Sequence, residues 1–221
     1  VLGLIVSALL TPALTALRAI LVPLVATAAA LAVGAAIMAL TGIHPWVGFK
    51  ALIAGAFGTP ARIGVTVTKA TPLILTGLAV ALPFRCGLLN IGGEGQIYMG
   101  ALAATLAALG LRGLPWAAHM PLVILAGFVG GALWGAIPGW LRARLKLNEL
   151  ITTIMLNYVA FWIVSYLVHG VMKDPQGGGY PWSVQVPSSA MLPLFLGKYR
   201  LNLGIGLALA LVAVANFILW K

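Results

Sequence analysis

A short polar segment between two uncharged, apolar runs holds the side chains best suited to chemistry. Arg85, Asn90, Glu94 and Gln96 lie in it, and glycines flank Glu94 at positions 92, 93 and 95. Glycines let the backbone leave a helix. If the two runs cross a membrane, a carboxylate between them costs about 2.5–3.5 kcal/mol, and irregular backbone is tolerated only inside protein or beside a water-filled cavity. These four residues are therefore candidates for a translocation path or gate.

Two other interpretations of this segment stay open. It is also compatible with a short cytoplasmic turn between two helices, in which Glu94 is a first-turn acid favoured by the helix dipole. An ion pair between Arg85 and Glu94 that fixes a re-entrant loop would combine both interpretations.

A second polar stripe lies on an otherwise apolar stretch. Thr153 and Asn157 are four residues apart and share one helical face. They would face either a neighbouring helix, through hydrogen bonds, or an aqueous path, so they join the candidate set. Glu149 is expected at the interface, where it offsets nearby positive charge or caps the helix together with Asn148. Asp174 is expected to be a solvated loop charge.

Enzyme chemistry is not indicated. The phosphate-binding loop, the serine nucleophile elbow and the zinc-binding helix motif are all missing from the sequence. Cys86 is the single cysteine, and the three histidines stand near the ends of apolar runs without clustered acids. We therefore expect no catalytic residue, no metal and no cofactor.

The amino-acid composition indicates the environment in which these residues are held. Of 221 residues, 62% are hydrophobic and only 7% are charged, with a formal net charge of +10. Disordered chains have the opposite balance, and nucleic-acid-binding proteins gather their basic residues on one face. Here basic residues stand singly between uncharged runs long enough to cross a bilayer core of about 30 Å. Lipid is the expected environment, and no nucleic-acid partner is expected.

The uncharged runs predict an all-α, polytopic membrane protein with about six spans and a broken or re-entrant segment near residues 84–96. A short surface helix is expected near 46–57, and residues 1–17 form an interfacial helix or a lead-in to the first span. The runs expected to form the spans lie at about 19–41, 71–84, 97–111, 119–141, 151–171 and 201–220.

The spacing of glycines indicates where helices pack together, and the position of basic residues indicates which side of the membrane a loop faces. Gly127, Gly131, Gly135 and Gly139 recur every fourth residue, a stripe that lets another helix approach closely in lipid. Arg142, Arg144 and Lys146 form the densest basic cluster, which marks the cytoplasmic side. The polar loop at 172–200 is then expected outside.

Three stretches resemble permease subunits of nucleoside and simple-sugar ABC importers, the broad group of the ribose and galactose permeases. FRCGLLNIGGEGQ at 84–96 is similar to the family signature FRxGLxNIGxEGQ, and NELITTIMLNY at 148–158 is similar to NEVITTIMLNY. KDPQGGG at 173–179 resembles the family's external KDPxGGG loop, in the same order and spacing. The resemblance covers about residues 19–221.

The resemblance implies ATP-driven alternating access for nucleosides or related small polar solutes. It implies a second homologous permease, a cytoplasmic ABC ATPase and an extracytoplasmic substrate-binding lipoprotein, in a bacterial or archaeal plasma membrane. The family's ATPase-coupling helix would follow residue 221, so 1–221 is expected to be a single permease domain truncated at its C-terminus. The alternative is a secondary transporter or channel with Glu94 as an ion-coupled group, which the scarcity of acids disfavours.

Overall fold

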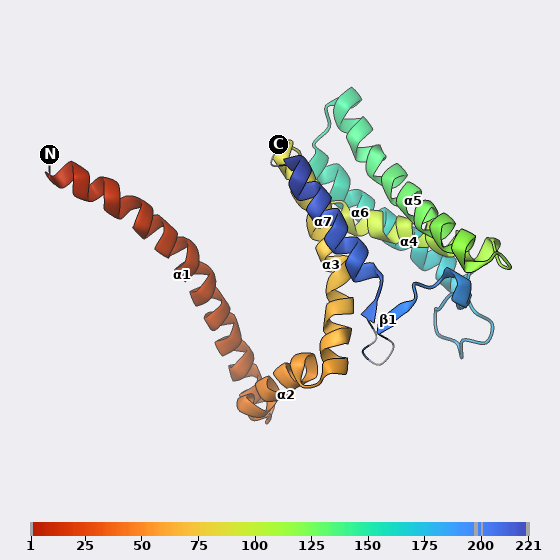
Figure 1. Cartoon of the computed structure of the whole chain (residues 1–221), viewed down its shortest axis with the longest axis horizontal. Coiled ribbons are helices and arrows are strands. Elements are labelled where there is room, and N and C mark those ends of the chain that lie inside the picture. The colour runs from red at the N-terminus through yellow and green to blue at the C-terminus, as the bar shows by residue number, and fades with distance from the viewer. Residues whose placement is uncertain (1, 197–198, 200, 220–221) are drawn as a thin grey trace. The chain divides into compact units, whose positions relative to one another are not determined.

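The computed structural model of the chain describes residues 2–196, 199 and 201–219, with side chains from residue 20 onward except 195 and 196. Helices dominate the described part (Figure 1). In chain order the elements are α1 (Leu2–Leu40), α2 (Pro45–Phe57), α3 (Pro60–Arg85), α4 (Gly93–Gly110), α5 (Trp116–Leu145), α6 (Glu149–His169), the 3-10 helix η1 (Ser188–Ala190), β1 (Leu194–Leu196), β2 (Leu201–Asn202) and α7 (Gly204–Leu219).

The expected helical membrane class is confirmed in its coarse form. Among the described residues, four helical segments are long and apolar enough to cross a bilayer: Ile20–Leu40, Pro60–Arg85, Trp116–Leu145 and Glu149–His169. The expected total of about six spans is not confirmed. Two of the expected spans correspond to α4, with 18 residues, and α7, with 16, which are not among these four.

Helix α3 is longer than the sequence patterns suggested. The apolar run was expected to begin at residue 71, but the helix already begins at Pro60. The Thr59 hydroxyl accepts a hydrogen bond from the Arg62 N–H at 3.3 Å, which is the contact of an N-cap residue. Proline suits the first turn that follows, because no N–H is needed there. The helix therefore includes two charged residues before the apolar run, Arg62 and Lys69, because the Thr-Pro start signal precedes them.

The chain forms two compact units, Val1–Ile63 and Gly64–Lys221. In the first unit, α1 is continuous from Leu2, so residues 2–17 belong to the same helix as the first span. Gly42, with φ +80°, ends this helix, and Ile43 N–H donates to Met38 O across the left-handed turn. The expected short helix near 46–57 is present as α2.

In the second unit, α4 packs against both α5 and α6 (Figure 1). Small residues allow this approach. A Cβ atom on Gly100 of α4 would lie 2.9 Å from the Gly127 carbonyl oxygen of α5. Further along the same contact, a Cβ on Gly131 would lie 3.2 Å from the backbone oxygen of Gln96. A Cβ on Gly135 would lie 2.8 Å from the side-chain Nε2 of Gln96. Gly139, the last residue of the stripe, has no neighbour within 4 Å of that position.

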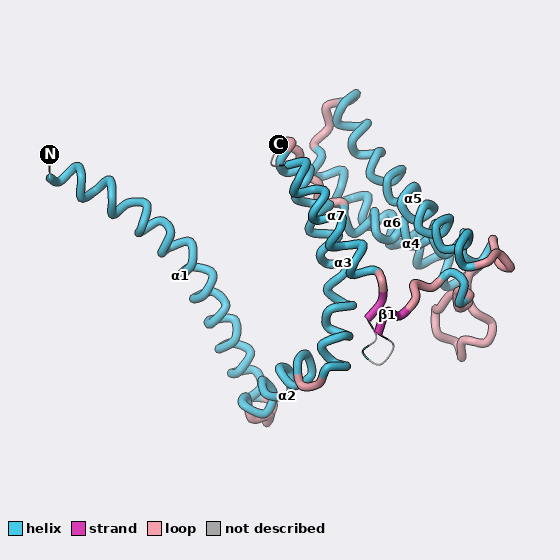
Figure 2. Tube along the Cα trace, in the orientation of Figure 1, coloured by secondary structure: helices cyan, strands magenta, loops and turns pink. Residues whose placement is uncertain are grey.

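The long polar loop after α6 contains structure that the sequence patterns did not indicate. β1 and β2 pair antiparallel, with Leu194 opposite Asn202, and form the short magenta arrows of Figure 2. The 3-10 helix η1 packs on the start of α5, where fully buried His119 bonds Ser189 Oγ through Nδ1 at 2.8 Å. The chain is thus almost all-α, with one two-stranded exception in the described residues.

The close contact of α4 with α5 predicts a size limit at Gly100. Gly100→Leu should lower the free energy of unfolding by about 1–3 kcal/mol, the usual cost of overpacking, and therefore lower the midpoint of thermal unfolding in detergent. Gly77→Leu is the matched control, because a Cβ there meets nothing within 4 Å. Equal midpoints for the two variants would contradict the packing described here.

Candidate functional site

The break in the polar segment starts with the end of α3. Gly87 has φ +72°, a left-handed conformation that glycine adopts without strain. Leu88 N–H then donates to Pro83 O at 2.9 Å, and Gly87 N–H donates to Phe84 O at 3.1 Å. This pair of bonds is the Schellman motif, which satisfies the last carbonyls of a helix. The chain therefore leaves α3 in a defined direction rather than through a loose loop.

Asn90 then organises the restart of the helix. Its Oδ1 accepts a hydrogen bond from Gly92 N–H at 2.9 Å, and Gln96 Nε2 lies 3.5 Å from the same oxygen. Gln96 N–H donates to Gly92 O at 3.1 Å as the first turn of α4 forms. Glu94 falls in this first turn and is exposed to solvent. The carboxylate thus lies where the helix dipole favours negative charge.

Asn157 of α6 joins the break to the neighbouring helix. Its Nδ2 donates to the Ile91 carbonyl oxygen at 3.0 Å, and its Oδ1 accepts from Gly95 N–H at 2.8 Å. One side chain therefore satisfies two backbone groups at the start of α4, the carbonyl of Ile91 in the break and the N–H of Gly95 in the first turn, which do not bond each other because the helix begins only at Gly93. We call this pair of bonds the Asn157 clamp.

Gly95 is needed for this arrangement. A Cβ there would lie 2.9 Å from Asn157 Oδ1 and 3.0 Å from Trp134 Nε1, so the first turn of α4 fits between α5 and α6 only without a side chain. Thr153, one turn before Asn157, is buried and bonds its own helix, with Oγ1 donating to Glu149 O at 2.7 Å. Its methyl group lies against Gly92.

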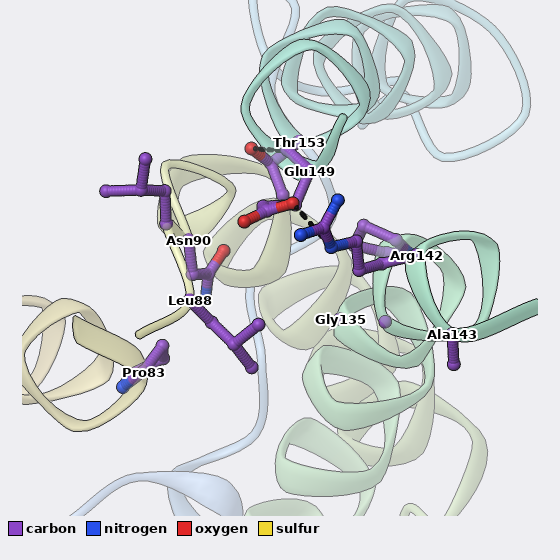
Figure 3. A pocket seen from close by; sticks show the side chains of 11 residues that line it. Pro83, Leu88, Asn90, Gly135, Arg142, Ala143, Glu149 and Thr153 are labelled. Carbon is purple, nitrogen blue, oxygen red and sulfur yellow. Dashed lines mark hydrogen bonds and ion pairs between the residues drawn. The ribbon is translucent and has the colours of Figure 1, made fainter. Parts of the chain in front are cut away.

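A cavity of about 430 Å³ lies beside the break, between the end of α5 and the start of α6 (Figure 3). Its polar wall carries Asn90, Thr153, Arg142 and Glu149. Its apolar wall is formed by residues from α3, the break and α5: Pro83, Leu88, Leu89, Gly135, Pro138, Gly139 and Ala143. Asn90 and Thr153, which the sequence separates widely, thus share one cavity with two charges.

The two charges form an ion pair, with Arg142 Nε 3.0 Å from Glu149 Oε2 (Figure 3). Asn148 caps α6, since its Oδ1 accepts a hydrogen bond from Leu150 N–H at 2.9 Å. Both expectations for this turn are confirmed: Glu149 offsets nearby positive charge, and Asn148 caps the helix.

The structure brings together some of the candidate residues and separates others. Asn90, Gln96 and Asn157 meet at the break, and Thr153 lies next to it. Arg85 is in the last turn of α3, and it is not joined to Glu94 by any ion pair among the described residues. No cluster of three or more histidine, cysteine, aspartate or glutamate side chains that could hold a metal occurs in the described part either.

Sequence patterns missed three contributors to the site. Trp134 and the backbone of Ile91 carry no signal of their own, because their roles follow from which helix packs where. For Arg142 the sequence predicts only a place in the basic cluster on the cytoplasmic side. The available signal was Asn157, an amide in the middle of an apolar helix, which needs a partner wherever the helix is buried.

The chain is similar to known permease components of transport systems. A family model described as "Branched-chain amino acid transport system / permease component" matches residues 62–221. The guanosine ABC transporter permease NupP of Bacillus subtilis is 41% identical over 204 residues, 91% of this chain and 58% of NupP. The glucose permease TsgB13 of Haloferax volcanii is 39% identical, over 79% of this chain and 46% of its own. The nucleoside permease NupB of Lactococcus lactis is 40% identical, over 71% and 43%.

The chain spans about half the length of these relatives. No solved structure matches it significantly.

The Asn157 clamp predicts how the break responds to mutation. Asn157→Leu leaves the Gly95 N–H and the Ile91 carbonyl without partners, so stability should fall by about 1–3 kcal/mol. The break should also open more often. Thr153 is buried against Gly92, so Thr153→Cys in a Cys86→Ser background can report this opening through the rate of its reaction with a thiol reagent.

Thr152→Val is the matched control. Thr152 lies on the same helix and bonds only its own backbone. Thr152→Val should leave the labelling rate of the cysteine at position 153 unchanged, whereas Asn157→Leu should raise it. Equal rates in the two variants would show that the clamp does not hold the break.

Proposed function

Since the chain belongs to the family of permease components of branched-chain amino acid transport systems, we propose that it is part of the transmembrane permease subunit of an ABC importer. The proposed cargo is a nucleoside or a related small polar solute such as a simple sugar. Two of the relatives named above are nucleoside or guanosine permeases and one is a glucose permease. The chain itself carries no enzyme activity in this proposal.

One observation carries the proposal. The two stretches that most resemble the importer permeases, 84–96 and 148–158, contact each other through the Asn157 clamp. A motif pair that meets at a helix break supports a role in gating, because broken helices with satisfied backbone groups are where transporters place movable or solute-binding segments. Arg85, Asn90, Glu94, Gln96, Thr153 and Asn157 are the proposed path or gating residues.

The proposed mechanism is alternating access. The break would move relative to α5 and α6 when the clamp opens, exposing the path on one side of the membrane at a time. Since this chain has no phosphate-binding loop, the energy would come from a cytoplasmic ABC ATPase. An extracytoplasmic lipoprotein would deliver the solute. A second, homologous permease would complete the path in a bacterial or archaeal plasma membrane.

We also propose that about six segments of this chain cross the membrane, with α4 and α7 added to the four long helices. An 18-residue helix such as α4 is about 27 Å long at 1.5 Å per residue, close to the thickness of the bilayer core. Its packing against α5 and α6 supports a position inside the bundle. The glycines Gly127, Gly131, Gly135 and Gly139 would then form or flank this packing face.

Transport by the whole importer tests the proposal. Proteoliposomes containing the complete permease pair, the ATPase and the binding protein should accumulate radiolabelled nucleoside or sugar only with ATP inside. An ATPase partner whose phosphate-loop lysine is replaced by alanine should abolish uptake. Accumulation driven by a proton gradient without ATP would overturn the proposal and favour an ion-coupled transporter.

A gating role of Glu94 makes a separate prediction. The side chain is exposed in the first turn of α4, so Glu94→Gln should change stability by only about 0.3–1 kcal/mol, the size of a helix-dipole contribution. We nevertheless expect it to lower the rate of uptake several-fold, because the negative charge is lost from the path.

Glu149→Gln serves as the comparison, because it weakens the Arg142 ion pair outside the break and should lower stability more than uptake. Unchanged uptake in Glu94→Gln, with unchanged assembly, would mean that Glu94 only stabilises the start of the helix.

A further inference from the structure

The cavity beside the break combines an apolar interior with donors at one end (Figure 3). Pro138 and Gly139 of α5 and Leu88 and Leu89 of the break contribute carbon surface, and both leucines are about two-fifths exposed. Arg142 lies further along α5 at the rim. Between Gly135 and Arg142 the helix rises about 10 Å. The lining of the cavity therefore changes from apolar to basic along about 10 Å of α5.

The polar groups of the wall are mostly occupied by the protein itself. The Thr153 hydroxyl donates to the Glu149 backbone oxygen, and the side-chain Oδ1 of Asn90 accepts from Gly92 N–H. Arg142 uses Nε for Glu149. Arg142 has N–H donors beyond the one on Nε, and within the described part of the chain no hydrogen bond from the Asn90 amide nitrogen to another residue is found. These groups are donors, so they suit an acceptor-rich group such as phosphate better than a neutral solute with its own hydroxyl donors.

The charge around the rim of the cavity also favours an anionic ligand. Arg144 and Lys146 follow Arg142 and are exposed, while Glu149 is the one acid nearby, so the turn has a net charge of +2. Arg142 is also the first charged residue after an uncharged run that begins at residue 113, so we expect it near the membrane surface. Basic pockets between transmembrane helices on the cytoplasmic side bind anionic lipid headgroups.

We propose that this cavity binds an anionic phospholipid of the cytoplasmic leaflet. The phosphate would accept hydrogen bonds from Arg142 and Asn90, and part of an acyl chain would lie against Gly139, Pro138 and Leu88. At about 430 Å³ the cavity holds only part of such a molecule, so the remaining chains would extend along the exposed leucines into the bilayer. The proposal does not depend on which solute is transported.

A protein partner is the competing occupant, since the basic turn faces the same side as the proposed ATPase. The lipid is favoured because the interior of the cavity is apolar and lies below the first charged residue of α5, within the depth of the hydrocarbon core. A soluble ATPase would contact the charged turn rather than the level of Gly135.

Retention of lipid by the assembled permease tests the proposal. The complete complex is placed in nanodiscs that contain equal amounts of phosphatidylglycerol and phosphatidylcholine, extracted gently and analysed by native mass spectrometry. The unmodified complex should retain phosphatidylglycerol in clear excess over phosphatidylcholine. Arg142→Gln should lower this ratio about fivefold, the equivalent of about 1 kcal/mol for one basic residue near a membrane surface.

Filling the cavity should have a stronger effect without a change of charge. Gly139→Leu places a side chain in open space on the cavity wall, and Ala143→Leu provides a second variant with high helix propensity. Both should abolish the excess of phosphatidylglycerol. Gly77→Leu and Arg112→Gln are controls for size and charge away from the cavity, and both should behave like the unmodified complex.

Three results would overturn the proposal. They are equal retention of the two lipids by the unmodified complex, an unchanged excess in folded Gly139→Leu and Ala143→Leu, and loss of ATPase co-purification in those variants with lipid retention intact. The last result would assign the cavity to a protein partner. Because lipid retention is measured without transport, each of these results is independent of the uptake experiments above.

Discussion

The structure around the candidate site depends on one constraint: backbone polar groups at a helix break need partners where water is scarce. Asn157 meets this need where the break joins α4, through Ile91 O and Gly95 N–H. Its amide carries one donor and one acceptor group at fixed geometry, which matches one carbonyl and one N–H. Remove either group and the break between α3 and α4 loses its attachment to α6.

Small residues make this bond possible. Gly95 lets the first turn of α4 reach Asn157 and Trp134, and Gly100 lets the same helix approach the backbone of α5. In lipid no hydrophobic force draws helices together, so close van der Waals contact and interhelical hydrogen bonds must hold them. The Asn157 clamp therefore joins α4 to α6, and the glycine contact joins α4 to α5.

Charge is concentrated at the edge of the bundle rather than at the break. Arg142 and Glu149 pair across the turn between α5 and α6, while Asn148 caps the helix that Glu149 begins. A partly exposed ion pair of this kind contributes only modestly to stability. Its larger effect is on shape, because it joins two residues that line the cavity beside the break.

The apolar environment and most of the helices could be predicted from local sequence, because uncharged runs can be stable only in lipid or in a core. The sequence also located the break, through glycines around Glu94, and the roles of Asn148 and Glu149, which act within one turn. It did not place the start of α3 at Pro60. That Asn157 holds the break, and that Asn90 shares a cavity with Arg142 and Thr153, depends on how the helices pack. Asn157 is more than sixty positions from Ile91 and Gly95, and Asn90 is more than fifty from Arg142 and Thr153. Local patterns carry no information about which helix faces which.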